Sequence, residues 1–245
     1  MCRSDDPRNK RLRPSLWVET GETSILIDAT PDLRAQALRH NIRHVDAVLL
    51  THTHADHIFG LDDLRAFTER EGRKMPLYGS AESLARIEQI FPYACEEKPR
   101  WPGLPSFELH AVDAGRDFEI TGLKIRALPV LHGRMTVFGF LFDGQFAYLT
   151  DCNEVSEEVV ETARGVPVLV IDALRHRPHP THLTVAEALE VVARVKPKLA
   201  LLTHMCHEVE HGQLEAALPE GVRVAYDGLV IEVENGEWRT VNSLL

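Results

Sequence analysis

The stretch VDAVLLTHTHADH (residues 45–57) decides the fold. Residues 45–50 form a nearly continuous apolar run, as expected of a β-strand that is buried on both faces. Four side chains that can bind a metal follow within the next seven residues: His52, His54, Asp56 and His57. Imidazole and carboxylate are the ligands that borderline divalent cations prefer, and so dense a group indicates more than one ion. A polar turn with chance histidines is the alternative, but this spacing directly after a strand favours a metal site.

Three further donors follow later apolar runs of the chain. His132 follows the run at 123–130, Asp151 follows 145–150, and His204 follows 198–203. One histidine in such a place would more often be structural. Three donors that all leave a β-segment as His52 does favour one site, because ligands gather beyond the strand ends of α/β sheets.

Glycine turns and helix caps divide the rest of the chain. Hairpins are predicted around Gly21 and Gly144, and strands are also predicted to begin near residues 166, 198 and 222. Helices are predicted after Thr30-Pro31, over 80–91, after Ser156, and from Thr184 to 196, where Thr184 and Glu187 form a capping box. Residues 95–106 contain three prolines and a glycine and are predicted to form a surface loop. This order predicts two sheets packed together with helices outside, in one domain over 1–245.

Composition narrows the class of protein. The net charge of −10 argues against a dedicated nucleic-acid binder. The four cysteines contain no C-x-x-C pair, which favours a reducing cytoplasm over a disulfide framework. No apolar run is long enough to span a membrane, and residues 1–15 lack the apolar stretch of a signal peptide.

The chain resembles the metallo-β-lactamase superfamily, and within it the phosphodiesterases related to phosphoribosyl 1,2-cyclic phosphate phosphodiesterase. LLTHTHADHIFGLDDLR (49–65) carries the superfamily resemblance. The narrower resemblance is carried by HGRMTVFGF (132–140), YLTDCN (148–153), DALRHRPHPTHLTVAEAL (172–189), LLTHMCHE (201–208) and LPEGVRVAYDG (218–228).

The resemblance implies a four-layer αββα sandwich that binds two divalent metal ions, zinc or manganese. It implies that His52, His54 and His132 bind one ion, that Asp56, His57 and His204 bind the other, and that Asp151 bridges them. His182 matches a histidine that contacts phosphate and assists the leaving group, although His179 lies close enough to be that residue instead.

Other residues are candidates for support of this site. Arg134 and Arg175 are candidate phosphate contacts, and surface positions are the alternative. Asp28 and Asp172 end strands and are candidates to hold ligand histidines, with strand capping as the alternative. Cys152 adjoins Asp151 and is interpreted as a packed neighbour rather than as a ligand.

The start of the chain departs from the family pattern. Relatives carry a further strand and a C-x-C-x-x-C loop that holds a structural zinc with a distant histidine. Here residues 1–14 resemble a remnant of that region, in which Cys2 would be the last cysteine and His207 the histidine.

The sequence therefore predicts a hydrolase that cleaves a small phosphodiester, such as a cyclic ribose phosphate, with a metal-bridging hydroxide as nucleophile and with Asp56, Asp151 and His182 as catalytic residues. One alternative is another hydrolase of this fold: a ribonuclease Z-like nuclease, a thioesterase or a β-lactamase. The other alternative is a non-catalytic metal-binding module. A nucleic-acid or membrane partner is not expected, and a homodimer is left open.

Overall fold

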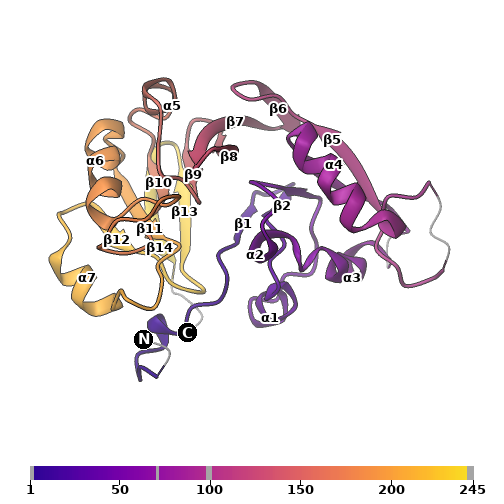
Figure 1. The fold of residues 1–245 in the computed structure, drawn as a ribbon, viewed down its shortest axis with the longest axis horizontal. Coiled ribbons are helices and arrows are strands. Elements are labelled where there is room, and N and C mark those ends of the chain that lie inside the picture. Colours follow the sequence, from indigo (N-terminus) through magenta and orange to yellow (C-terminus); the bar gives the residue numbers. More distant parts are fainter. Residues whose placement is uncertain (1–2, 70–71, 98–100, 242–245) are drawn as a thin grey trace. The chain divides into compact units, whose positions relative to one another are not determined.

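A computed structural model describes residues 3–69, 72–97 and 101–241, and the chain forms two compact units (Figure 1). The N-terminal unit is Arg13–Leu123. The C-terminal unit is Lys124–Leu245 together with Met1–Leu12. Each unit contains a β-sheet with helices packed against it, and each is described by itself.

The N-terminal unit is built on a five-stranded sheet in the order β1-β2-β3-β4-β5. These strands are Leu16–Glu19, Ser24–Ile27, Ala47–Leu49, Met75–Gly79 and Phe107–Ala111. The hairpin predicted around Gly21 is confirmed, because β1 pairs antiparallel with β2 from Leu16–Ile27 to Glu19–Ser24. The remaining neighbours are parallel, so the carboxyl ends of β2 and β3 lie at one edge of the sheet.

Short helices follow the strands of this unit: α1 (Leu33–Arg39), α2 (Ala55–Ile58), α3 (Arg65–Thr68) and α4 (Ala81–Ile90), with 3-10 turns at Leu61–Leu64 and Pro92–Ala94. The Ser80 hydroxyl accepts from the Ser83 amide and caps α4, which packs on β4 and β5 (Figure 1). Leu84 and Ile87 of α4 join a buried core with Val48 and Leu77. Burial of each such side chain contributes about 1.5–3 kcal/mol.

The second sheet has seven strands in the order β12-β11-β10-β9-β8-β7-β6. From β6 to β12 they are Asp117–Ile120, Leu123–His132, Met135–Phe142, Phe146–Leu149, Val168–Asp172, Leu199–Thr203 and Val222–Val224. Strand β6 is the last strand of the N-terminal unit, and the C-terminal unit begins within β7. Strands β9 to β12 are parallel, so the ends of β9, β10 and β11 lie at one edge. A separate hairpin pairs β13 (Val230–Glu234) with β14 (Glu237–Val241).

The helices of the C-terminal unit are α5 (Glu157–Thr162), α6 (Val185–Val195) and α7 (His211–Ala217), with a 3-10 turn at Pro7–Asn9. The predicted caps are confirmed: Ser156 caps α5, and Thr184 and Glu187 form a capping box on α6. Helix α6 packs on β10 and β11 through its buried valine and alanine face. Within the described residues, no helix combines the length and the apolar character that crossing a bilayer requires.

A close backbone approach explains Gly60, which follows the metal-binding motif by three residues. Its amide donates to the Ala29 carbonyl at 2.8 Å, and a Cβ built at this position would lie 1.9 Å from the Thr30 carbonyl oxygen. Only glycine therefore allows the segment after His57 to pack against the end of β2.

We expect Gly60→Ala to lower the free energy of unfolding by about 3 kcal/mol, because backbone must move to admit the methyl group. Gly21→Ala is the matched control, since a Cβ there has no atom within 4 Å. Urea unfolding of both variants measures the difference. Equal stability of the two variants would show that Gly60 is not needed for this packing.

Candidate metal centre

The predicted donors of the N-terminal unit lie in the turn that links β3 to α2. His52 follows β3, His54 precedes α2, and Asp56 and His57 lie in its single turn. The ring of His52 lies 4.5 Å from that of His54 and 4.2 Å from that of His57, measured between centroids. The His57 Nε2 lies 3.9 Å from the Asp56 carboxylate. The turn therefore brings all four donors of the motif together.

Asp28, which follows β2, holds two of these histidines. Its fully buried carboxylate accepts from His57 Nδ1 at 2.7 Å, from the Thr51 hydroxyl at 2.7 Å and from the Thr51 amide at 2.9 Å. Because the Thr51 hydroxyl gives its proton to Asp28, it accepts from His52 Nδ1, which lies 3.0 Å away. Both imidazoles are thus protonated at Nδ1, which leaves Nε2 as the atom that can bind a cation.

The predicted donors of the C-terminal unit also gather at strand ends. His132 ends β7, Asp151 follows β9, and His204 follows β11. The His204 Nε2 lies 3.3 Å from Asp151 Oδ1, and the His182 Nε2 lies 3.9 Å from the same oxygen. His132, Asp151 and His182 each offer one possible ligand atom, and these three atoms lie within 4.8 Å of one another. This geometry suits binding of a cation by two or three of these side chains.

The ring orientation of two histidines in this unit is fixed in the same way. His132 Nδ1 donates to the Thr181 carbonyl at 2.8 Å, and His182 Nδ1 donates to the buried Asp172 carboxylate at 2.8 Å. Asp172 also accepts from the Cys152 amide at 3.1 Å. With His52 and His57, four imidazoles therefore have Nδ1 engaged, which is the arrangement that metal-binding histidines adopt.

The backbone is strained at three of these positions. Asp28, Asp151 and His204 have φ angles of 60°, 51° and 59°, in the left-handed region. Such conformations cost about 1–3 kcal/mol each in residues other than glycine and cluster at functional sites. The Thr150 hydroxyl donates to Asp151 at 2.7 Å and helps to hold that carboxylate.

Burial dominates the electrostatics of the supporting groups. It raises the pKa of the Asp172 carboxyl, an effect that the nearby His204 opposes. Burial also raises the pKa of the Cys152 thiol, and Cys152 packs in the core, as the sequence predicted. The pKa of His179 is lowered, first by burial and then by the neighbouring His182.

Comparisons with known proteins agree with this geometry. Residues 23–205 match the family model described as the beta-lactamase superfamily domain. The chain belongs to the metallo-β-lactamase superfamily. A diphosphatase from the PhnP family, known from a crystal structure, is 38% identical to this chain in sequence and superposes on it with a TM-score of 0.86. The alignment covers 93% of this chain and 86% of the diphosphatase chain. This confirms the predicted fold class and the predicted resemblance.

Two curated relatives extend the comparison. An octanoyltransferase of Porphyromonas gingivalis is 35% identical over 94% of this chain, but the match covers only 46% of that protein, so the chain spans about half its length. A ribonuclease Z of Methanopyrus kandleri is 29% identical, with 93% of this chain and 94% of the relative covered. Proteins similar to this chain thus include a diphosphatase and a ribonuclease Z, and the metallo-β-lactamase fold implies divalent metal ions.

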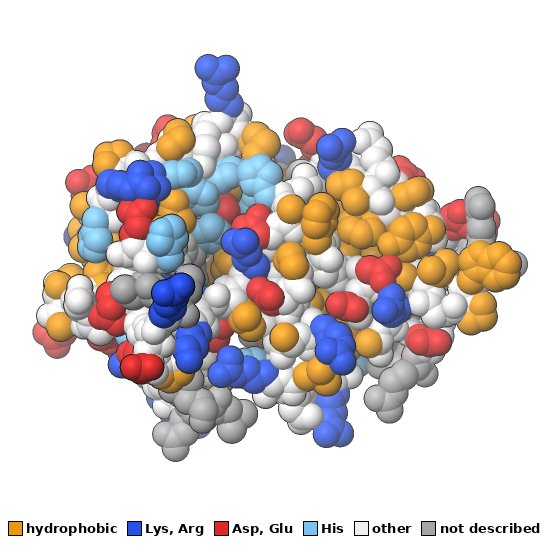
Figure 2. All heavy atoms as spheres, turned by 60° about the horizontal axis from the view of Figure 1, so that its bottom comes forward, with side chains coloured by type: hydrophobic (Ala, Val, Ile, Leu, Met, Phe, Trp, Pro, Cys, Tyr) orange, Lys and Arg blue, Asp and Glu red, His pale blue; other side chains and the backbone are white. Residues whose placement is uncertain are grey.

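The predicted substrate contacts have different surroundings. His179 is partly exposed, its ring lies 5.0 Å from that of His182, and histidine side chains reach the surface on the face shown in Figure 2. Arg175 donates to the carbonyls of Arg177 and Pro178, so its guanidinium holds this loop. Arg134 is exposed. That these three side chains contact phosphate stays a prediction.

The predicted zinc remnant consists of Cys2 and His207. His207 is exposed on the loop after β11, and Cys2 lies outside the described residues.

The Thr51 hydroxyl and the Thr181 carbonyl, which contact His52 and His132, are not among the predicted residues. A signal for the first exists, because threonine precedes the donor in LLTH, YLTD and the second LLTH (residues 49–52, 148–151 and 201–204). No local signal marks the second, because residues 132 and 181 are far apart in the sequence.

We expect Asp28→Asn to lower metal affinity about 10–100-fold, because the amide cannot accept from both His57 and Thr51 as the carboxylate does. Asp46→Asn is the matched control, since Asp46 accepts from the His44 ring at 2.7 Å in the same unit but outside the motif. Competition with a chromophoric chelator gives both affinities. A similar affinity in the two variants would contradict a supporting role for Asp28.

Proposed function

We propose that the protein is a binuclear metal-dependent phosphodiesterase that acts on a small phosphodiester. The observation that carries the proposal is the way the imidazoles are held: Nδ1 of His52, His57, His132 and His182 is bound to an oxygen of the protein, the arrangement in which metal-site histidines are oriented, and these histidines belong to groups whose possible ligand atoms lie within 4.8 Å of one another. Two metal ions would take the donors of both units: His52, His54 and His132 for one, Asp56, His57 and His204 for the other, and Asp151 for both.

The donor set fits divalent zinc or manganese, since it contains only imidazole and carboxylate. When bound, two such ions lower the pKa of a water towards about 7 and neutralise charge on a phosphoryl group. Asp151, held by Thr150, would supply the carboxylate that both ions share.

His182 would protonate the departing oxygen. Asp172 binds its Nδ1 proton at 2.8 Å, so the ring is fixed with Nε2 turned towards the Asp151 side, 3.9 Å from that carboxylate. With a second proton on Nε2 the ring would be an imidazolium, which the Asp172 carboxylate would stabilise. The Nε2 proton would then be placed for transfer to a leaving alkoxide. Arg134 and His179 would contact the phosphate.

The PhnP-family diphosphatase supports a phosphoryl substrate for this chain. The full-length match to a ribonuclease Z favours a second candidate, a tRNA-processing nuclease. The net charge of −10 argues against it, and acidic side chains lie among the basic ones on the face shown in Figure 2. A small substrate is therefore the better supported choice.

A panel of substrates tests the proposal. Purified protein would be assayed with manganese or zinc on bis(p-nitrophenyl) phosphate, a cyclic ribose phosphate, a dinucleoside diphosphate, a precursor tRNA, nitrocefin and lactoylglutathione. We expect turnover of the small phosphoryl esters and none of the lactam or the thioester. Preferred cleavage of precursor tRNA would favour the nuclease, and hydrolysis of the lactam or thioester alone would contradict the proposal.

A further inference from the structure

A short N-terminal segment fastens the loop that carries His204. Asn9 is 4% exposed, and its side-chain amide bonds in both directions: Nδ2 donates to Glu210 Oε1 at 2.6 Å, and Oδ1 accepts from the His211 amide at 2.9 Å. Glu210 and His211 form the start of α7. Asn9 therefore fixes the end of the loop that begins at His204 and leads into α7.

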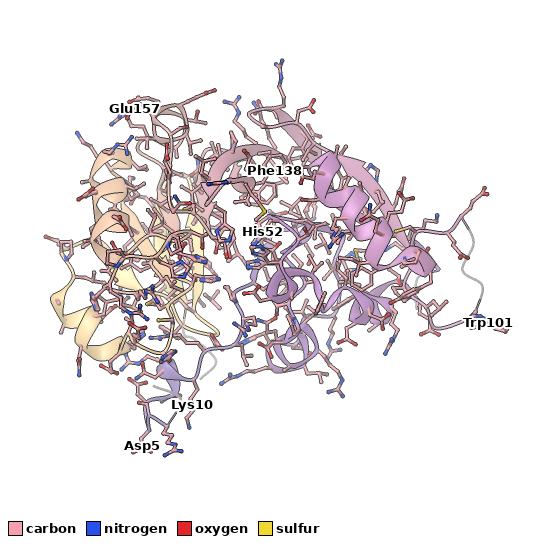
Figure 3. All side chains as sticks on the ribbon, viewed as in Figure 1. Asp5, Lys10, His52, Trp101, Phe138 and Glu157 are labelled. Atoms are coloured by element: carbon pink, nitrogen blue, oxygen red, sulfur yellow. The ribbon has the colours of Figure 1, made fainter. Side chains whose placement is uncertain are left out.

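Arg11 fastens the middle of the same loop. Its Nη1 donates to the carbonyl of Cys206 at 3.2 Å and to that of Val209 at 3.0 Å. The Val209 amide in turn donates to the Cys206 carbonyl at 3.3 Å, so the guanidinium closes both ends of one turn. The Leu12 amide donates to the Asp227 carboxylate at 2.9 Å, beyond β12. We call residues 9–12 the N-terminal clasp; Figure 3 labels Lys10 within it.

The guanidinium of Arg11, which binds this loop, is partly removed from water. Burial lowers the pKa of Arg11, which Asp227 and Glu210 oppose, and the Arg11 Nε is buried with no hydrogen-bond partner among the residues that the structure describes. Removing a charge from water is costly, and an apolar side chain could fill similar space at lower cost. A guanidinium differs from such a side chain in its rigid fork of donors, which fixes the geometry of the backbone that it binds.

The loop held by Arg11 begins with a residue that needs support. His204 lies two residues before Cys206 and has a φ of 59°, a strained conformation that persists only where its surroundings impose it. The Cys206 amide is also bound, to the Leu174 carbonyl at 2.9 Å, so Arg11 completes the fixation of this peptide. We propose that Arg11 is a positioning residue for His204, holding it where it can bind the second metal ion. This inference rests on the proposed function.

The test compares Arg11→Met and Arg11→Lys with Arg8→Met. Arg8 lies in the same segment, but its guanidinium bonds to Asp6, at 2.8 Å, within that segment. Cobalt titration of the metal-free proteins, followed by visible absorption, measures the affinity for each ion. Hydrogen exchange of the peptide over 204–211 measures the order of the loop without metal, and a thermal melt without metal shows that each variant is folded.

We expect Arg11→Met to bind one cobalt ion as the wild type does and the other about 10–100-fold more weakly, with faster exchange in the loop. Arg11→Lys keeps the charge but loses the fork, so it should show a smaller loss of the same affinity, and it serves if Arg11→Met does not fold. Arg8→Met should match the wild type in both readouts.

The failures are distinguishable. A wild type that binds two ions, together with a folded Arg11 variant that binds both with unchanged affinity, overturns the clasp alone, even if exchange is faster. A wild type that binds fewer than two ions overturns the proposed function and the clasp with it.

Discussion

Asp151→Ala is expected to reduce turnover of bis(p-nitrophenyl) phosphate by at least about 10³-fold, because removing one of several residues that act together in catalysis removes most of the rate enhancement. Asp151 is 2% exposed, and His204 and His182 both turn Nε2 towards it. It would be the carboxylate that both metal ions share, so its removal should also lower the metal content. Initial rates and elemental analysis of the purified variant measure the two effects.

The variant Asp143→Ala is the control for the strained backbone at Asp151. Asp143 has a φ of 47° and lies in the turn between β8 and β9, so Asp143→Ala places the same substitution in the same backbone region. Asp143→Ala should retain turnover and metal. Similar rates in the two variants would show that Asp151 has no special role.

His182→Ala is expected to lower kcat by about 10²–10⁴-fold for a phosphodiester with an alkoxide leaving group, the usual contribution of a general acid. The decrease should be much smaller for a p-nitrophenyl ester, because p-nitrophenolate departs without a proton.

His179→Ala is the control for this experiment, because His179 lies 5.0 Å from His182 and is the alternative for the same role. His179 Nδ1 accepts from the Thr181 amide at 3.3 Å, whereas His182 Nδ1 donates to the Asp172 carboxylate. If the decrease in kcat depends on the leaving group in His179→Ala but not in His182→Ala, the general acid is His179 and not His182.

Several elements of the fold could be predicted from signals that lie close together in the sequence. The caps at Ser156 and Thr184 and the turn at Gly21 each depend on a few adjacent residues, and each is confirmed. Strand β4 was missed because Pro76 interrupts a five-residue segment, although its burial alternates as a strand requires. Strands β13 and β14 were missed because they are largely exposed and therefore lack an apolar run.

The site was predictable to the extent that its donors follow strands. Parallel pairing places the ends of β9, β10 and β11 at one edge, which is why Asp151, Asp172 and His204 lie in one region. The supporting contacts were not predictable, because they join segments distant in the sequence: His132 to Thr181, and Asn9 to Glu210. Such contacts depend on the folded chain and leave no periodic or local pattern.

The most direct measurement is the anomalous diffraction of crystals grown with manganese. We predict two ions about 3.5–4 Å apart, with Asp151 between them and each ion bound by donors from both the N-terminal and the C-terminal unit. A single ion, or ions that touch the donors of one unit only, would contradict the binuclear centre.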